Sequence, residues 1–356
     1  MTRTKALAGV LVIAAAVIAG STSPAPAAPA PTLRELVGQR FVISFAGTSP
    51  SEALLARVRR GEIGGVILFG PNVARASQVR GLTQALHGAA REAGRPRLLV
   101  VTDQEGGAIR RFRWAPPLPS ADLIGAMSPP EIRAFGRRTA ASLRGLGVDV
   151  DLAPVADTPR VEGAFIEAQR RAFSRDPDRV AGAAVAFARG LADGDVLATA
   201  KHFPGLGGAV GNTDFVPVTV GGGSAGARAD LVPFRRLVES GVPLVMLSNA
   251  VYPAYGSTPA LLAPAVHSLL RETLGFDGVT ITDALEPVAR TRGIALSTLA
   301  VRTARAGTDL LLFAGGEGAS ADAFRRVLAA AREGELSRVA LERSYRRIVA
   351  MKAAIK

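Results

Sequence analysis

Eight short runs of apolar and β-branched residues recur along the chain, and segments with helix-like spacing separate them. The runs lie at 40–45, 65–69, 97–103, 148–152, 197–202, 244–248, 279–283 and 309–313. Strands that are buried on both faces and alternate with helices indicate a parallel sheet. Eight such units match a (β/α)8 barrel, whose usual size is about 250 residues. The sequence therefore predicts an α/β fold with a (β/α)8 barrel; an open, doubly wound parallel sheet is the alternative.

The segments between these runs have apolar residues three and four positions apart, which is typical of helices packed on a core. They lie at 51–61, 76–93, 129–146, 176–192, 229–240, 264–274, 294–306 and 320–333. A final helix over 335–356 is expected to close the barrel. No Pro- or Ser-rich linker interrupts residues 32–356, so we expect a single barrel domain over 28–356.

Residues 1–27 have the pattern of a cleaved signal peptide. Two cations precede an uninterrupted apolar run at 6–20, and Ala25-Pro26-Ala27 offers a cleavage site with small residues. The run is short for a membrane span, which needs about 20 residues; an uncleaved anchor is the alternative. We therefore expect an exported protein, extracellular or associated with the cell wall, that has no stable membrane insertion after cleavage.

The composition excludes several kinds of chemistry. Among 356 residues there is no cysteine and there are only three histidines, so we expect no disulfide, no cysteine nucleophile, no metal and no cofactor. The net charge is +13, but aromatic residues make up only 5% and the arginines are scattered. We therefore expect no binding of nucleic acid. Weak electrostatic association with anionic cell-wall polymers is the expected effect of this charge.

Charged residues stand at the ends of several predicted strands, where active sites of (β/α)8 barrels lie. Asp103 ends the third run, Lys201 and His202 end the fifth, and Asp283 ends the seventh. Lys201 is the only lysine between residues 6 and 351, so this position favours a compact ammonium group where the chain otherwise uses arginine. We expect these side chains to converge on one pocket, where two carboxylates across a sugar-sized gap would suit glycoside hydrolysis.

Three motifs, in this order, resemble the signatures of glycoside hydrolase family 3. They are VTDQEGGAIRRF at 101–112, AKHFPGLGG at 200–208 and LGFDGVTITDAL at 274–285; RAFSRDP at 171–177 and SNAVYPAYGSTPA at 248–260 look similar as well. Their order and spacing resemble the single-domain bacterial β-N-acetylhexosaminidases of that family. The resemblance implies a retaining glycoside hydrolase that acts on β-linked sugars. It favours N-acetyl-β-glucosaminides from peptidoglycan fragments, with β-glucosides as a further option, and the signal peptide makes the enzyme a secreted one.

The resemblance also implies roles for individual residues. Asp283 matches the nucleophile, which forms a covalent glycosyl-enzyme. The residues that match the sugar-binding positions are Asp103, Arg111, Arg171, Lys201 and His202. Simpler structural roles remain as alternatives: a surface cation at Arg111, a slip of one position from Arg171 to Arg170, a packed core residue at His202 and a helix N-cap at Asp283.

One loop departs from the family pattern. After the Lys-His motif, the hexosaminidases carry an Asp-x-His pair in which the histidine is the general acid/base and the aspartate orients it. The matching residues here are Asn212 and Asp214, and this loop contains no histidine. The segment 205–211 contains four glycines, and their backbone freedom would allow the loop to close over a substrate.

Three interpretations of this departure stay open. In the first, Asp214 itself is the acid/base, which requires burial or a neighbouring carboxylate to raise its pKa, whereas a nearby Lys201 would lower it. In the second, hydrolysis is lost and the protein binds sugars without cleaving them. In the third, Asn212 and Asp214 only form a turn, and another residue such as Glu105 supplies the acid.

Overall fold

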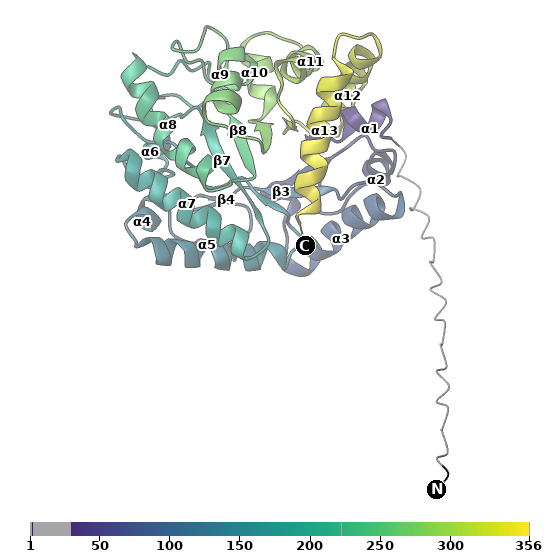
Figure 1. Ribbon diagram of the computed structural model, residues 1–356, viewed down its shortest axis with the longest axis horizontal. Helices are drawn as coiled ribbons and strands as arrows, with labels where there is room; N and C mark the ends of the chain where they lie inside the picture. Colours follow the sequence, from purple (N-terminus) through teal and green to yellow (C-terminus); the bar gives the residue numbers. More distant parts are fainter. Residues whose placement is uncertain (1, 3–29, 222, 356) are drawn as a thin grey trace. The chain divides into compact units, whose positions relative to one another are not determined.

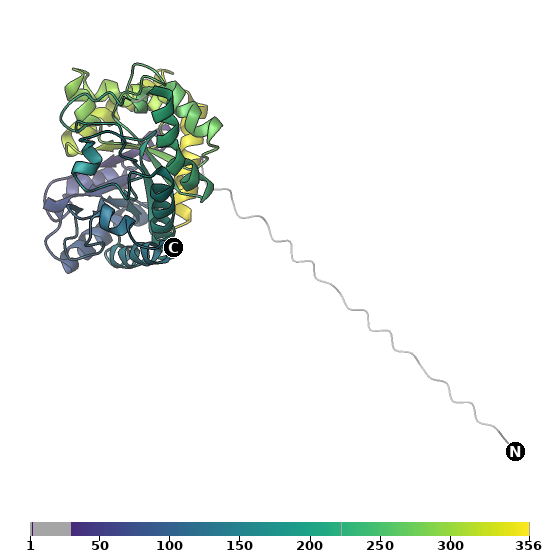
Figure 2. The same cartoon turned by 90° about the vertical axis from the view of Figure 1, so that its left-hand side faces the viewer.

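In the computed structural model, eight parallel strands form a barrel with helices around it (Figure 1). Along the sheet the strand order is β10-β1-β2-β3-β6-β7-β8-β9. A parallel bridge between Ile281 and Leu310 joins the two ends of this order. The predicted (β/α)8 barrel is therefore confirmed, and the open doubly wound sheet is wrong. Figure 2 shows the helices on the outside of the sheet from a second direction.

The structure describes residue 2 and residues 30–221 and 223–355. The barrel forms one unit over Thr32–Lys356. Except for residue 2, the predicted signal peptide at 1–27 lies outside the described residues. Within the described part of the chain, no helix combines the length and the apolar character needed to cross a bilayer.

Each of the eight predicted strands is present, although most are shorter than the apolar run that indicated them. They are β1 (Phe41–Ile43), β2 (Gly65–Leu68), β3 (Leu99–Thr102), β6 (Val150–Asp151), β7 (Leu197–Phe203), β8 (Leu244–Leu247), β9 (Val279–Thr282) and β10 (Leu311–Phe313). A small hairpin of β4 (Gln104–Gly106) and β5 (Ile109–Arg110) follows β3, and the sequence did not predict it. The hairpin turns at Gly106 and Gly107, whose φ angles are +112° and +55°.

The helices follow the predicted alternation with the strands. They are α1 (Leu33–Gly38), α2 (Glu52–Arg59), α3 (Ala76–Glu92), α4 (Ala121–Gly125), α5 (Pro129–Arg144), α6 (Phe165–Ala168), α7 (Pro177–Asp193), α8 (Gly223–Glu239), α9 (Pro264–Ser268), α10 (Leu285–Thr291), α11 (Leu296–Ala306), α12 (Glu317–Arg332) and α13 (Arg338–Ala353). The last helix begins at Arg338 and not at the predicted position 335. The Ser337 side chain accepts a hydrogen bond from the Ala340 N–H and so caps the helix there.

Alternating strand residues fill two separate apolar regions. On β1, Val42 faces the inside of the barrel, whereas Phe41 and Ile43 pack against the surrounding helices. Burying an aliphatic or aromatic side chain of this size stabilises a fold by about 1.5–3 kcal/mol. Because side chains fill the barrel interior, the space for a ligand lies above them, at the carboxyl ends of the strands.

Candidate active site

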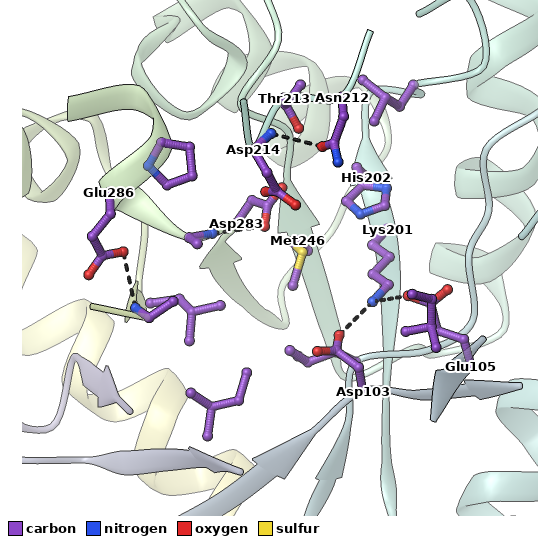
Figure 3. A pocket seen from close by; sticks show the side chains of 18 of the residues that line it. Asp103, Glu105, Lys201, His202, Asn212, Thr213, Asp214, Met246, Asp283 and Glu286 are labelled. Atoms are coloured by element: carbon purple, nitrogen blue, oxygen red, sulfur yellow. Dashed lines mark hydrogen bonds and ion pairs between the residues drawn. The ribbon is translucent and has the colours of Figure 1, made fainter. Parts of the chain in front are cut away.

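A cavity of about 490 Å³ lies at the carboxyl ends of the strands (Figure 3). Side chains from the barrel interior, such as Met246 and Leu312, form apolar parts of its lining. Every site residue predicted from the sequence lines this one cavity: Asp103, Arg111, Arg171, Lys201, His202, Asp214 and Asp283. The convergence expected from the strand ends is thus present in the structure.

Lys201 is the centre of an ion-pair cluster on one side of the cavity. Its side chain is 2% exposed, and Nζ lies 2.9 Å from Oδ1 of Asp103 and 2.6 Å from Oε1 of Glu105. Arg111 Nη2 donates to the other oxygen of Asp103 at 2.9 Å. Burial raises the pKa of Asp103, but the cations of Lys201 and Arg111 outweigh it and hold this pKa well below its usual range. Asp103 is therefore ionised and acts only as a hydrogen-bond acceptor.

Arg171 forms a two-point contact with Glu105 in the same cluster. Its Nε and Nη2 each donate to a carboxylate oxygen of Glu105 at 2.8 Å. Burial raises the pKa of Glu105, but Arg171 and Lys201 bring it down to about 2, so Glu105 is a poor proton donor near neutral pH. The neighbouring Arg170 instead pairs with Asp122 in an exposed position, which places Arg171 and not Arg170 in the cavity.

His202 is oriented by Asp157, a buried carboxylate after the fourth strand to which the sequence analysis gave no role. Its Nδ1 lies 2.7 Å from Oδ2 of Asp157, and its backbone N–H donates to Oδ1 at 3.0 Å. Because an ionised carboxylate only accepts, Nδ1 carries the proton, and Nε2 is the ring nitrogen left for a ligand. Asp157 also accepts from the Leu206 N–H at 2.7 Å. Its position shortly after the fourth predicted strand was the available signal.

Asp283 follows β9 directly and lies on the side of the cavity opposite the ion-pair cluster (Figure 3). Its Oδ1 accepts from the Ala284 N–H at 2.8 Å. Ala284 occupies the N-cap of α10 and makes no side-chain cap, so Asp283 is not the cap of this helix. Burial raises the pKa of Asp283; His202 lowers it and Asp214 raises it, and the pKa is raised overall.

Asp214 reaches the cavity from the loop between β7 and α8, and its carboxylate points toward that of Asp283 (Figure 3). Asn212 Oδ1 accepts from the Asp214 N–H at 2.8 Å, and Arg290 Nη2 donates to the Asp214 carbonyl. Asp214 is exposed; of the two features considered from the sequence, burial and a neighbouring carboxylate, the structure therefore has only the carboxylate, which is Asp283. Asn212 and Asp214 thus form a turn, as the third interpretation expects, and Asp214 also lies in the cavity, as the first interpretation requires.

The glycines at the start of this loop serve close packing. A Cβ on Gly207 would lie 1.7 Å from the Thr158 carbonyl oxygen, and one on Gly205, where φ is +130°, would lie 2.5 Å from Cβ of Asp230. The Gly207 carbonyl also accepts from the Arg160 N–H at 3.1 Å. Any closure of the loop over a substrate is therefore restricted to the part that follows these contacts.

Comparison with known proteins identifies the family. The model of the glycosyl hydrolase family 3 N-terminal domain matches residues 32–351. An uncharacterized secreted glycosyl hydrolase of Arthroderma benhamiae is 36% identical over 327 residues, which are 89% of this chain and 92% of that protein. A β-hexosaminidase of Stenotrophomonas maltophilia is 35% identical over 253 residues, which are 68% of this chain and 73% of that protein.

Solved structures agree with this assignment. A β-N-acetylhexosaminidase from Beutenbergia cavernae superposes with a TM-score of 0.85 at 29% identity and covers 91% of this chain and 99% of its own. A family 3 β-N-acetylglucosaminidase from a Paenibacillus species has a TM-score of 0.84 at 31% identity over 91% of this chain, which spans 63% of that longer protein. The chain belongs to glycosyl hydrolase family 3, and it is a β-N-acetylhexosaminidase-like glycoside hydrolase.

Proposed function

We propose that the protein hydrolyses N-acetyl-β-glucosaminides with retention of configuration, through a covalent glycosyl–Asp283 intermediate. The observation that carries this proposal is the single cavity in which Asp214 and Asp283 point toward one another beside the Lys201 cluster. In retaining glycosidases one carboxylate attacks the anomeric carbon, while a second group protonates the leaving oxygen and then activates water. The β-hexosaminidase names of several relatives support the choice of sugar.

The ion-pair cluster would hold the sugar ring. Asp103, kept ionised by its cations, has lone pairs for two hydroxyl groups, and Lys201 and Arg111 can donate to the same hydroxyls. His202 can contact the sugar through Nε2. Glu105 holds the guanidinium group of Arg171 in a fixed orientation beside it. These groups would hold the anomeric carbon near Asp283 and so lower the entropic part of the barrier.

Asp214 would act as the acid/base in place of the family histidine. Two carboxylates that face each other resist double ionisation, so the pair retains a proton more readily than an isolated carboxylate would. The pKa of Asp283 is raised overall by burial, and His202 and Lys201 oppose this rise, so these two cationic neighbours favour the ionised form of the nucleophile. The first step needs an ionised nucleophile at Asp283 and a protonated acid at Asp214.

Turnover of aryl glycosides tests this function. We expect the purified protein to cleave aryl N-acetyl-β-glucosaminide faster than aryl β-glucoside, and Asp283→Ala to abolish both activities. Asp277→Ala, an exposed carboxylate six positions upstream, is the matched control and keeps wild-type turnover. If wild type and Asp283→Ala are equally inactive on a wide aryl-glycoside panel, hydrolysis is not the function.

A second candidate function is sugar binding without hydrolysis, which the absence of a histidine from the 205–217 loop favours. It predicts saturable binding of N-acetylglucosamine in calorimetry without turnover of any aryl glycoside. Asp103→Ala would abolish this binding, because it removes the acceptor for two hydroxyl groups. Observed turnover that depends on Asp283 would exclude this candidate.

We further propose that the protein is exported and then lies outside the cell or in the cell wall. The support is the signal-like pattern at 1–27 and the word "secreted" in the name of the Arthroderma benhamiae relative. Mass spectrometry of protein from the culture medium and the cell-wall fraction should find a new N-terminus near position 28. An intact N-terminus in the cytosolic fraction alone would contradict export.

A further inference from the structure

A second groove, on the outside of the barrel, is lined mainly by arginines. It has a volume of about 470 Å³ and lies among α1, α2 and α12. Its charged lining consists of Arg34, Arg57, Arg60, Arg325, Arg332 and one carboxylate, Glu62. No residue of this groove lines the first cavity. Because Glu62 precedes β2, the groove lies toward the amino ends of the strands, whereas the first cavity lies at their carboxyl ends.

Arg57 brings unused hydrogen-bond donors to this groove. Its side chain is 8% exposed, and Nη1 donates to the Glu317 carbonyl and to Ser320 Oγ, at 3.1 Å in both cases. Nε and Nη2 are buried and make no hydrogen bond in the described part of the chain, and of the two only Nε has an ion-pair contact there, at 3.7 Å from Oε2 of Glu62. Buried donors without a partner are costly, so a ligand that accepts from them would remove an existing penalty.

The arginines of the groove outnumber the carboxylates that neutralise them. Glu62 accepts from Arg34 at 2.6 Å and from Arg60 at 2.8 Å. Its other oxygen lies 3.7 Å from Nε of Arg57, so one negative charge serves three cations. Arg325 pairs with the exposed Asp322, and no ion pair of Arg332 occurs among residues 30–221 and 223–355.

The charges around the groove shift the pKa of Arg57. Burial lowers its pKa; Glu62 and Glu317 raise it, and the cations of Arg60 and Arg325 lower it further. Positive groups that repel one another in a groove attract an anion, which would lower the free energy of all of them at once.

We propose that this groove binds phosphate-class oxyanions that carry two or more negative charges. Guanidinium groups match the oxygens of phosphate in pairs, through parallel N–H···O bonds that a single ammonium group cannot make. Several arginines around one groove suit a linear chain of phosphates better than a single small ion. Phe324 and Leu328 contribute apolar lining to the groove, against which a short carbon linker between phosphates would pack.

Calorimetric titration with sodium tripolyphosphate, and separately with an oligomer of glycerol phosphate, tests the proposal. Sodium chloride keeps the ionic strength constant, since screening would otherwise change any charge-driven binding. The test variant is Arg325→Gln/Arg332→Gln, because both side chains are exposed. The control is Arg137→Gln/Arg138→Gln, which removes the same charge from exposed positions on α5, a helix that contributes no residue to the groove.

We expect wild type and control to bind tripolyphosphate equally and the test variant to bind at least about tenfold more weakly, which is the usual effect of losing a charge-assisted hydrogen bond. Binding of the glycerol phosphate oligomer as well would extend the ligand class to phosphodiester polymers. Binding of tripolyphosphate alone would restrict it to anions with closely spaced charges. No binding by wild type, or equal weakening in test and control variants that keep the wild-type circular dichroism spectrum, would overturn the proposal.

Discussion

The carboxylates of Asp214 and Asp283 point toward one another, although the two residues are 69 positions apart in the sequence (Figure 3). Asp283 is fixed at the end of β9, whereas Asp214 stands on a loop that Asn212 and Arg290 hold by its backbone. The proposed acid/base role of Asp214, in place of the family histidine, depends on this placement of its carboxylate. The predictions below follow from this pair and from the contacts that support it.

Asp214→Ala should slow turnover according to the leaving group. If Asp214 protonates the leaving oxygen, its loss should cost about 10²–10⁴-fold for poorly acidic leaving groups and much less for nitrophenols, which leave without a proton. Added azide should restore part of the turnover, because it can occupy the space of the missing carboxylate. A series of aryl N-acetyl-β-glucosaminides measures the dependence, and an equal loss for every leaving group would argue against an acid/base role.

Asp157→Asn should lower kcat/KM through His202. The carboxylate holds the proton on Nδ1 at present; an amide that donates to Nδ1 would favour the other tautomer and put the proton on Nε2. We expect a decrease of at least about tenfold, since a comparable Asp→Asn change in the serine-protease triad costs far more. Steady-state kinetics measures the effect, and unchanged kcat/KM in a variant with wild-type thermal stability would contradict the role of Asp157.

Asp151 should make the protein less stable as the pH rises. Burial raises the pKa of this carboxyl from 3.8 to about 8, and its Oδ2 has no hydrogen-bond partner in the described residues. Between these two pKa values the folded state keeps a proton that the unfolded chain releases. Each pH unit in this window therefore costs up to about 1.4 kcal/mol of stability.

Urea denaturation at pH 5 and pH 8 measures this effect. Wild type and the exposed control Asp277→Asn should both lose unfolding free energy over this range. Asp151→Asn removes the titrating group and should lose clearly less. If the three proteins show the same change with pH, Asp151 does not titrate as expected.

Gly207→Ala should destabilise the protein, because the new Cβ would meet the Thr158 carbonyl oxygen at 1.7 Å. We expect a loss of at least about 2 kcal/mol, typical of forcing atoms into a filled site. Gly81→Ala is the matched control: it lies inside α3, no atom comes within 4 Å of its added Cβ, and it should stabilise by about 0.5–1 kcal/mol. Thermal unfolding compares the two variants. Equal melting temperatures would show that the backbone at Gly207 can move to accept a Cβ, and would contradict the prediction.

The strand positions and the shared cavity could be predicted from the sequence because β-branched runs and strand-end charges are local signals. Asp157 could not be assigned in this way, since its contact with His202 depends on how two neighbouring strands align. The β4–β5 hairpin was missed because it spans only a few polar and glycine residues, yet it carries Arg111 back to Asp103. The exposure of Asp214 likewise depends on the path of a loop, which no periodicity encodes.

The arginine groove shows a further limit of sequence reasoning. Its residues come from α1, from α2 and the turn after it, and from α12, and on the sequence they are scattered cations of a basic chain. Only the fold brings them together and leaves two donors of Arg57 without a hydrogen bond in the described residues.

The covalent intermediate provides the most direct test of the central claim. Wild-type protein treated with an activated 5-fluoro analogue of an N-acetyl-β-glucosaminide should gain the mass of one sugar. Proteolysis should place the sugar on the peptide that contains Asp283, and Asp283→Ala should gain nothing. A sugar attached to a different residue, or no adduct under conditions in which the wild type turns over aryl glycosides, would contradict the mechanism.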